Sequence, residues 1–80
     1  MAKFTVILEF CGGTYIRQVK ATSPRTALRK LATGAGDKKN VFLALVADGT
    51  IAIEGISNCW CSSATLRGKL ALGNIVKTAD

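Results

Sequence analysis

The sequence predicts an α+β domain with the element order ββαββα, in which two helices pack on one face of a four-stranded antiparallel sheet. Three observations predict it. Large apolar side chains recur at every second position of residues 4–10, which is typical of a strand. Ser23-Pro24 is typical of a helix start, because serine caps free backbone N–H groups and proline fits the first helical turn. The pairs Gly12-Gly13 and Asp48-Gly49 are typical of hairpin turns.

The first hairpin is expected to pair residues 4–10 with residues 14–21 around the Gly12-Gly13 turn. In this register Phe10 faces Tyr15 and Leu8 faces Arg17, so Arg17 lies on the apolar side. A slip of one residue would bring a more polar set of side chains to that side, which is less favourable.

A helix is expected over residues 24–33, with Gly34 just beyond its end. Its apolar stripe at helical spacing consists of Ala27, Leu28, Leu31 and Ala32.

The second half is interpreted as a repeat of the same order. Val41–Ala47 is apolar on both faces and predicts a central strand, and residues 50–56 return after Asp48-Gly49. A second helix is expected over residues 64–72, followed by a tail at 74–80. The two halves are either generic hairpin-helix units, which we favour, or a true duplication. The predicted core is Phe4, Val6, Leu8, Val19, Leu28, Leu31, Phe42, Ala44, Val46, Ile51, Ile53, Leu66 and Leu70.

Length and composition predict a single domain over residues 1–80. No signal peptide and no apolar run of membrane-spanning length is visible, so we expect a cytoplasmic protein without membrane contact. The three cysteines, Cys11, Cys59 and Cys61, are expected to be reduced thiols, because an odd count does not suit a disulfide framework.

Catalytic chemistry is not expected. The sequence contains no histidine, so a Ser–His or Cys–His pair cannot form within one chain. A metal site is not expected either, because Cys59 and Cys61 offer one close pair where structural zinc needs four ligands. Cys61 would precede the second helix, where a helix dipole lowers the pKa of a thiol, so a reactive thiol stays an alternative. No cofactor is implied.

Basic residues carry the functional prediction, since eleven Lys and Arg against five Asp and Glu give a net charge of +6. Such a charge favours an anionic partner. The first expected helix and the loop after it carry one basic cluster, Arg25, Arg29, Lys30, Lys38 and Lys39. Two further residues stand out: Arg17, which is on the apolar face beside Tyr15, and the aromatic Trp60. The candidate binding residues are Arg17, Arg25, Arg29, Lys30, Lys38, Lys39 and Trp60.

These observations predict a small, basic, non-enzymatic binding module that acts by protein–protein contact, as inhibitors, adaptors and accessory proteins do. An acidic protein surface is the favoured partner, binding of nucleic acid phosphates through Lys and Arg patches is the alternative, and a homodimer is left open. The opening hairpin and capped helix resemble those of many small hairpin-helix proteins, including some antitoxins and phage accessory proteins. The resemblance is one of pattern, so it assigns a role to no residue.

Overall fold

The structure is a computed structural model that describes residues 1–79. Its elements are five strands, two α-helices and one 3₁₀ helix, in the order β1 (Ala2–Phe10), β2 (Gly13–Ala21), α1 (Pro24–Thr33), η1 (Gly36–Lys38), α2 (Lys39–Asp48), β3 (Ile51–Ala52), β4 (Cys59–Leu66) and β5 (Lys69–Ala79). The α+β class is confirmed. The predicted order and strand number are wrong in the second half of the chain.

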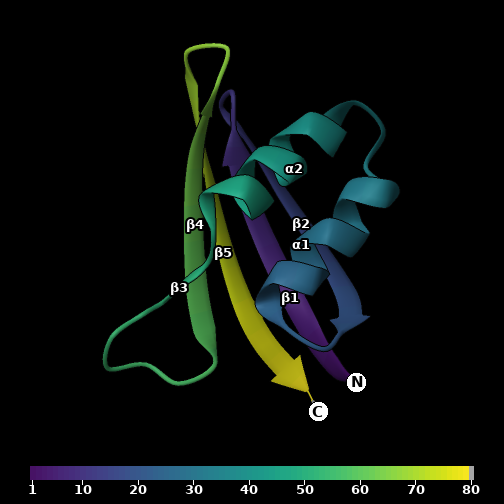
Figure 1. The fold of residues 1–80 in the computed structure, drawn as a ribbon, viewed down its shortest axis with the longest axis vertical. Coiled ribbons are helices and arrows are strands. Elements are labelled where there is room, and N and C mark those ends of the chain that lie inside the picture. Colours follow the sequence, from purple (N-terminus) through teal and green to yellow (C-terminus); the bar gives the residue numbers. More distant parts are fainter. Residues whose placement is uncertain (80) are drawn as a thin grey trace.

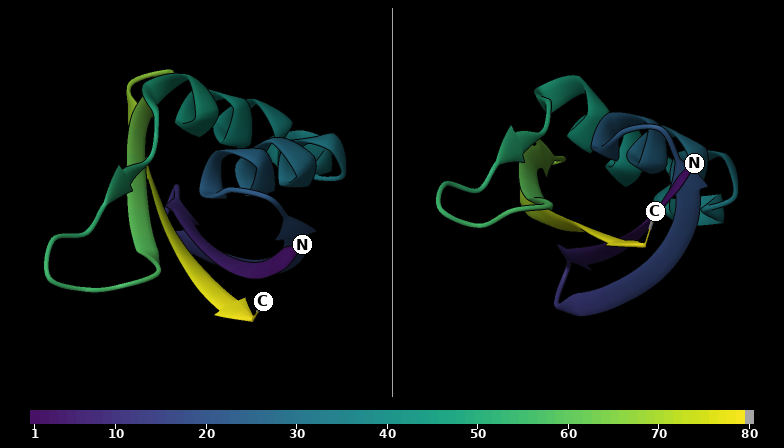
Figure 2. Two further views of the ribbon diagram at one scale, coloured as in Figure 1. Left: turned by 60° about the horizontal axis from the view of Figure 1, so that its bottom comes forward. Right: turned by 90° about the horizontal axis from the view of Figure 1, so that it is seen from below.

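The five strands form one antiparallel sheet in the order β2-β1-β5-β4-β3. The last strand of the chain, β5, lies at its centre between β1 and β4 (Figure 1). Both α-helices lie on the same side of the curved sheet, so the domain has two layers (Figure 2). The predicted packing of two helices on one face is therefore correct, although the second helix is formed by other residues.

The first hairpin has its turn one residue earlier than predicted, at Cys11-Gly12. Both turn residues have positive φ angles, 52° and 77°, as a two-residue type I′ turn requires. The strand register is consequently shifted by two residues, so that Leu8 pairs with Tyr15 and Val6 with Arg17. Because side chains alternate with a period of two, this shift leaves every side chain on its predicted face.

Helix α1 confirms the sequence prediction at both ends. The Ser23 hydroxyl accepts a hydrogen bond from the Thr26 backbone N–H at 3.1 Å, and Pro24 is the first helical residue. The stripe turned toward the sheet is buried at Ala27, Leu28 and Ala32, and Leu31 is half-buried. A cap and an apolar face at helical spacing are thus sufficient to predict this helix.

The segment 41–47 is a helix and not the predicted strand. Its buried residues are Val41, Phe42, Leu45 and Val46, the i, i+1, i+4, i+5 spacing of a helical face. Helix α2 has no side-chain cap at its start, because it continues directly from η1, and the usual start signal is therefore missing. Asp48-Gly49 is the end of this helix and not a hairpin turn, with Gly49 at φ 96° donating its N–H to the Leu45 carbonyl.

The predicted second helix is also wrong, since residues 64–72 form parts of β4 and β5. Their turn is Arg67-Gly68, with φ angles of 53° and 76°, a second type I′ turn. Of the predicted strand 50–56 only Ile51–Ala52 is a strand, and residues 74–79 belong to the central β5 rather than to a tail. The chain is therefore not two ββα units, and neither interpretation of its halves as repeats holds.

The core lies between the helices and one face of the sheet. Six of the predicted core residues are buried, and Val19, Leu31 and Leu66 pack against them as partly buried side chains. Ile51 and Leu70 are exposed at 66% and 59%, because they lie on the face of the sheet away from the helices. The buried hydrophobic residues are Phe4, Val6, Leu8, Ala21, Ala27, Leu28, Ala32, Val41, Phe42, Leu45, Val46, Ala71 and Ile75.

Candidate anion-binding site

A hollow of about 160 Å³ lies where the edge strand β2 meets the end of α1 and the start of α2. Alternation along β2 turns Tyr15 and Arg17 toward the helix layer. The last turns of α1 contribute Lys30 and Leu31, and η1 contributes Lys38. We refer to this hollow as the basic pocket; it is lined by Tyr15, Arg17, Lys30, Leu31, Gly34, Ala35, Lys38 and Phe42.

Among residues 1–79, three cationic side chains and no carboxylate line the basic pocket. Arg17 donates from Nη1 to the backbone carbonyl of its neighbour Ile16 at 2.9 Å. Lys30 donates from Nζ to the Lys20 carbonyl at 2.8 Å. Within residues 1–79 neither of these cations forms a salt bridge. Lys30 Nζ also donates to the Met1 sulfur at 3.6 Å, so one of its three N–H donors is left. Arg17 keeps more capacity for an incoming anion, since a guanidinium has five N–H donors.

Lys38 is the third cation, and it is held between an aromatic ring and an acid. Its Nζ lies 4.7 Å from the centroid of the Tyr15 ring, a cation–π geometry, and 3.4 Å from a carboxylate oxygen of Asp37. Desolvation acts to lower the pKa of Lys38, but the hydrogen bond and charge of Asp37, together with Tyr15, outweigh it and raise the pKa above the usual lysine value. Lys38 is therefore fully charged at neutral pH.

The inner part of the pocket is apolar. Phe42 is only 3% exposed, and Leu31 and Ala35 are half-buried. Arg17 and Lys30, by contrast, are exposed. The pocket thus has charged groups at its mouth and hydrocarbon at its floor.

Arg17 and Lys30 also protect the free edge of the sheet. In a hairpin closed by a two-residue turn, the odd-numbered residues of β2 bond to β1, and the even-numbered ones direct their backbone groups outward. The two carbonyls that accept from these cations, Ile16 and Lys20, are on that outer edge. Cationic side chains over an open edge hinder its pairing with another strand, so the pocket and not the strand edge is the candidate for binding.

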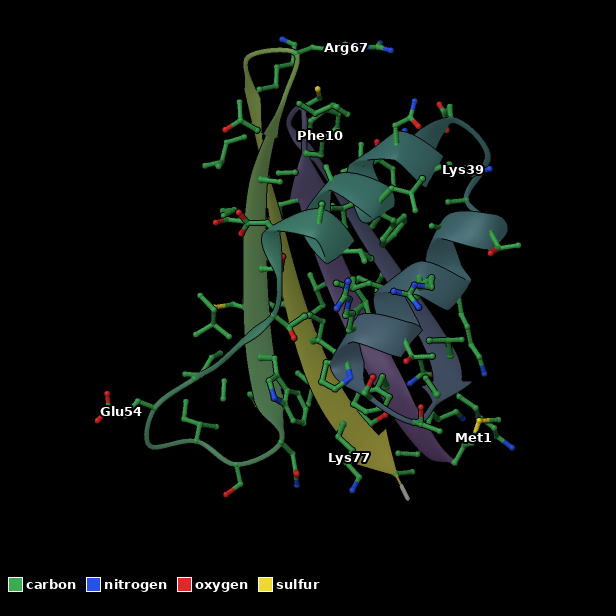
Figure 3. All side chains as sticks on the ribbon, in the orientation of Figure 1. Met1, Phe10, Lys39, Glu54, Arg67 and Lys77 are labelled. Carbon is green, nitrogen blue, oxygen red and sulfur yellow. The ribbon has the colours of Figure 1, made fainter. Side chains whose placement is uncertain are left out.

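The structure brings together three of the seven predicted binding residues, Arg17, Lys30 and Lys38. Arg25 and Arg29 are exposed on α1 and do not line the pocket. Lys39 is exposed at the first residue of α2, and its side chain points away from the sheet (Figure 3). These last three cations therefore do not form a single site with Arg17.

Trp60, the seventh predicted residue, lies on β4, which is three strands away from β2 in the sheet, toward the other edge. It is half-buried, and its ring is 5.9 Å from the ring of Phe4, tilted by 59°. This is an aromatic contact at the end of the core.

Sequence reasoning misses the apolar floor of the pocket, because it places Phe42 in a strand rather than in α2.

The structure does not place Cys61 before a helix, the arrangement that would have made it a reactive thiol. Cys61 lies within β4 and precedes no helix, so the helix dipole that would have activated it is absent. Cys59 and Cys61 are half-buried free thiols, and Cys11 is exposed in the first turn. Within residues 1–79 no group of three or more His, Cys, Asp and Glu side chains is placed to hold a metal ion.

The chain matches no family model, no curated protein and no solved structure, so no family is assigned. In the part of the chain described, no helix combines the length and the apolar character that crossing a membrane requires.

Proposed function

We propose that this protein is a non-enzymatic binding module that holds an acidic partner protein by taking a carboxylate into the basic pocket. One observation carries the proposal: Arg17, Lys30 and Lys38 line one hollow, and among residues 1–79 no acidic side chain lines it, although Asp37 pairs with Lys38 beside it. Charge-assisted hydrogen bonds to a carboxylate are stronger than neutral ones, and a guanidinium can bind both carboxylate oxygens at once. The net charge of +6 would add long-range attraction for an acidic surface.

The composition of the pocket supports binding rather than catalysis. Its titratable lining consists of two lysines, one arginine and one tyrosine. None of these side chains has an ordinary pKa near seven, the range in which a general acid–base catalyst works best. The pocket therefore offers charge and shape for recognition and no obvious carrier for a proton.

Binding of nucleic acid is the second candidate, favoured by the exposed Arg25 and Arg29 on α1. They stand four residues apart, so both can reach one backbone of phosphates. The basic pocket is a single hollow and not an extended groove, however, and nucleic acid backbones present a row of charges. We therefore rank this function below carboxylate recognition.

The test compares two double variants that remove the same charge. Arg17→Gln/Lys38→Gln neutralises the pocket, and Arg25→Gln/Arg29→Gln neutralises the outer face of α1. The probe is poly-L-glutamate, with binding measured by isothermal titration calorimetry at 0.15 M salt. We expect the pocket variant to lose about tenfold or more in affinity, as the loss of charged hydrogen bonds implies. Equal losses in the two variants would contradict the proposal, because net charge alone would then explain binding.

A thymidine oligonucleotide distinguishes the second function. If it binds the wild type more tightly than poly-L-glutamate does, and if Arg25→Gln/Arg29→Gln abolishes this binding, the nucleic acid function is correct and the carboxylate function is wrong. Salt provides an independent measurement, since phosphate-driven affinity falls steeply and log-linearly as salt increases.

A further inference from the structure

We infer that the ligand group of the basic pocket is a carboxylate next to an apolar side chain or ring, rather than the carboxylate of an internal Asp or Glu or a phosphate. This inference rests on the proposed function and specifies its ligand. The chemistry is found at the C-terminal residue of a protein that ends in Phe or Leu, and also in small aromatic or branched aliphatic acids.

Charge and hydrocarbon are separated within the pocket. Arg17 and Lys30 are exposed at its mouth. The apolar surface that a ligand could still cover belongs to the half-buried Leu31 and Ala35, since Phe42 is only 3% exposed. A ligand that satisfies both regions has its charge at one end and an apolar body at the other. Phosphate has no apolar part, so it would leave the floor in contact with water and gain nothing there.

The size of the pocket suits one apolar group. At about 160 Å³ the pocket is close to the roughly 150 Å³ of an engineered apolar cavity that binds benzene. One phenyl ring or one leucine side chain therefore fits. An internal glutamate or aspartate has no hydrocarbon beyond its carboxylate, so it would fill the charged mouth and leave the floor empty.

The cationic residues at the mouth belong to separate elements of the fold. Arg17 comes from β2, Lys30 from α1 and Lys38 from η1, so the positive charges approach from three different elements. Tyr15 lies beside Lys38, so an aromatic ring also lines the pocket next to one of its cations. A carboxylate held among these side chains would direct its apolar substituent toward Leu31 and Phe42.

The experiment is a titration of the full chain, labelled with ¹⁵N, followed by NMR. The main probe is N-acetyl-phenylalanine, which has an apolar ring and a free carboxylate. Its amide, N-acetyl-phenylalanine amide, keeps the ring without the charge, and inorganic phosphate keeps a charge without the ring. We expect the acid to bind at least about tenfold more tightly than either control, with shifts at the backbone amides of Tyr15, Arg17 and Leu31.

Two matched variants test whether N-acetyl-phenylalanine binds in the basic pocket. Arg17→Gln should weaken binding of N-acetyl-phenylalanine about tenfold, whereas Arg25→Gln, which removes the same charge from an exposed site outside the pocket, should leave it within about twofold. Leu31→Asn should weaken the acid without strengthening phosphate. Equal effects of Arg17→Gln and Arg25→Gln would overturn the assignment to this pocket.

Further probes distinguish the two sources of the ligand, and they show whether the inference or the proposed function fails. Phenylacetate is compared with a hexapeptide that ends in a free phenylalanine carboxylate. Tighter binding of the peptide indicates a protein C-terminus. Equal binding indicates a small acid, which would overturn the partner protein of the proposed function while the ligand chemistry inferred for the pocket stands. If a hexapeptide with an internal glutamate and an amidated end binds as tightly as these probes, the inference is wrong although the proposed function stands. If poly-L-glutamate binding is unaffected by the pocket variant and N-acetyl-phenylalanine also fails to bind, both are wrong.

Discussion

Ser62 on β4 donates its hydroxyl hydrogen to the backbone carbonyl of Leu45 on α2, with 2.8 Å between the oxygens. This bond crosses the boundary between the two layers. Ser62 is 3% exposed and is the one buried polar residue among residues 1–79. The same carbonyl also accepts from the Gly49 N–H at 3.1 Å, where α2 ends. The contact thus fixes the end of α2 against the sheet.

Ser62→Ala is expected to destabilise the fold by about 1 kcal/mol, because one buried hydrogen bond is lost while the Leu45 carbonyl keeps its bond to Gly49. For a domain of this size the melting temperature should fall by roughly 4–8 °C. Thermal unfolding followed by circular dichroism measures it. The control is Ser63→Ala, an exposed neighbour on the same strand, which should change little. Equal effects would show that strand propensity and not the hydrogen bond is responsible.

Gly73 on β5 leaves room for Leu45, and Gly73→Ala should therefore crowd the core. A Cβ at this position would lie 3.0 Å from Leu45 Cδ1. We expect a loss of about 1 kcal/mol or more, the lower end of the range for added methyl groups in a packed core, since the leucine side chain can shift. Urea unfolding of Gly73→Ala and of Gly73→Ala/Leu45→Val measures it, and the shorter valine should restore part of the loss.

The control for this prediction is Gly34→Ala. Gly34 has φ −105°, and no heavy atom lies within 4 Å of the place that an added methyl group would occupy, so neither strain nor crowding is expected. A destabilisation of Gly34→Ala as large as that of Gly73→Ala would show that the cost does not come from contact with Leu45.

Leu28→Ala is expected to cost about 2–5 kcal/mol, because this side chain is completely buried between α1 and the sheet. Leu43 on α2 is 41% exposed, so Leu43→Ala removes the same atoms from a site in contact with water. Its cost should be under about 1 kcal/mol. Chemical denaturation of both variants tests whether α1 presents its predicted stripe to the core, and similar costs would contradict that orientation.

The first half of the fold can be predicted from sequence because its signals are local and agree with one another. The alternation in β1, the Ser23 cap and the apolar stripe of α1 each define one element. The turn itself is misplaced by one residue, because local sequence favours two glycines where positive φ angles are needed, whereas the structure places Cys11 at φ 52° in the turn.

The second half cannot be predicted in the same way, because its signals are ambiguous without tertiary contacts. A short run that is apolar on all sides, such as 41–47, fits a buried strand as well as a buried helix. Leu66 and Leu70 have helical spacing, but they flank the Arg67-Gly68 turn and lie on opposite faces of the sheet. The pairing of β5 with β1, far apart in the chain, decides this arrangement, and it leaves no local trace.

The candidate site is predicted only in part for the same reason. Arg17 stands out because charge on an apolar face is anomalous, and that anomaly depends only on the first hairpin. Its partners Lys30 and Lys38 are recognisable as basic residues, but their convergence with Phe42 depends on α2, which the sequence pattern assigns to the wrong element. Trp60 is a candidate for its residue type alone, and the structure places it against Phe4.

Arg25→Glu is expected to stabilise the protein by roughly 0.3–1 kcal/mol. Arg25 is exposed in the first turn of α1, which contains no acidic residue, so its positive charge faces the positive end of the helix dipole. The substitution reverses that interaction. It also converts the like-charged pair Arg25 and Arg29 into a Glu–Arg pair at i, i+4, in the more favourable orientation.

Arg29→Glu is the matched control for this last change. It makes the same charge change in the middle of α1, where the dipole acts weakly, and it creates the less favourable Arg–Glu orientation. Its stability should remain within about 0.5 kcal/mol of the wild type. Both variants are measured by thermal unfolding at 0.02 M and 0.5 M salt, and the gain from Arg25→Glu should shrink at the higher concentration because screening weakens surface electrostatics. A gain that is equal for the two variants, or that persists unchanged in high salt, would show that relief of the overall positive charge or helix propensity is responsible, rather than the position of Arg25 at the start of α1.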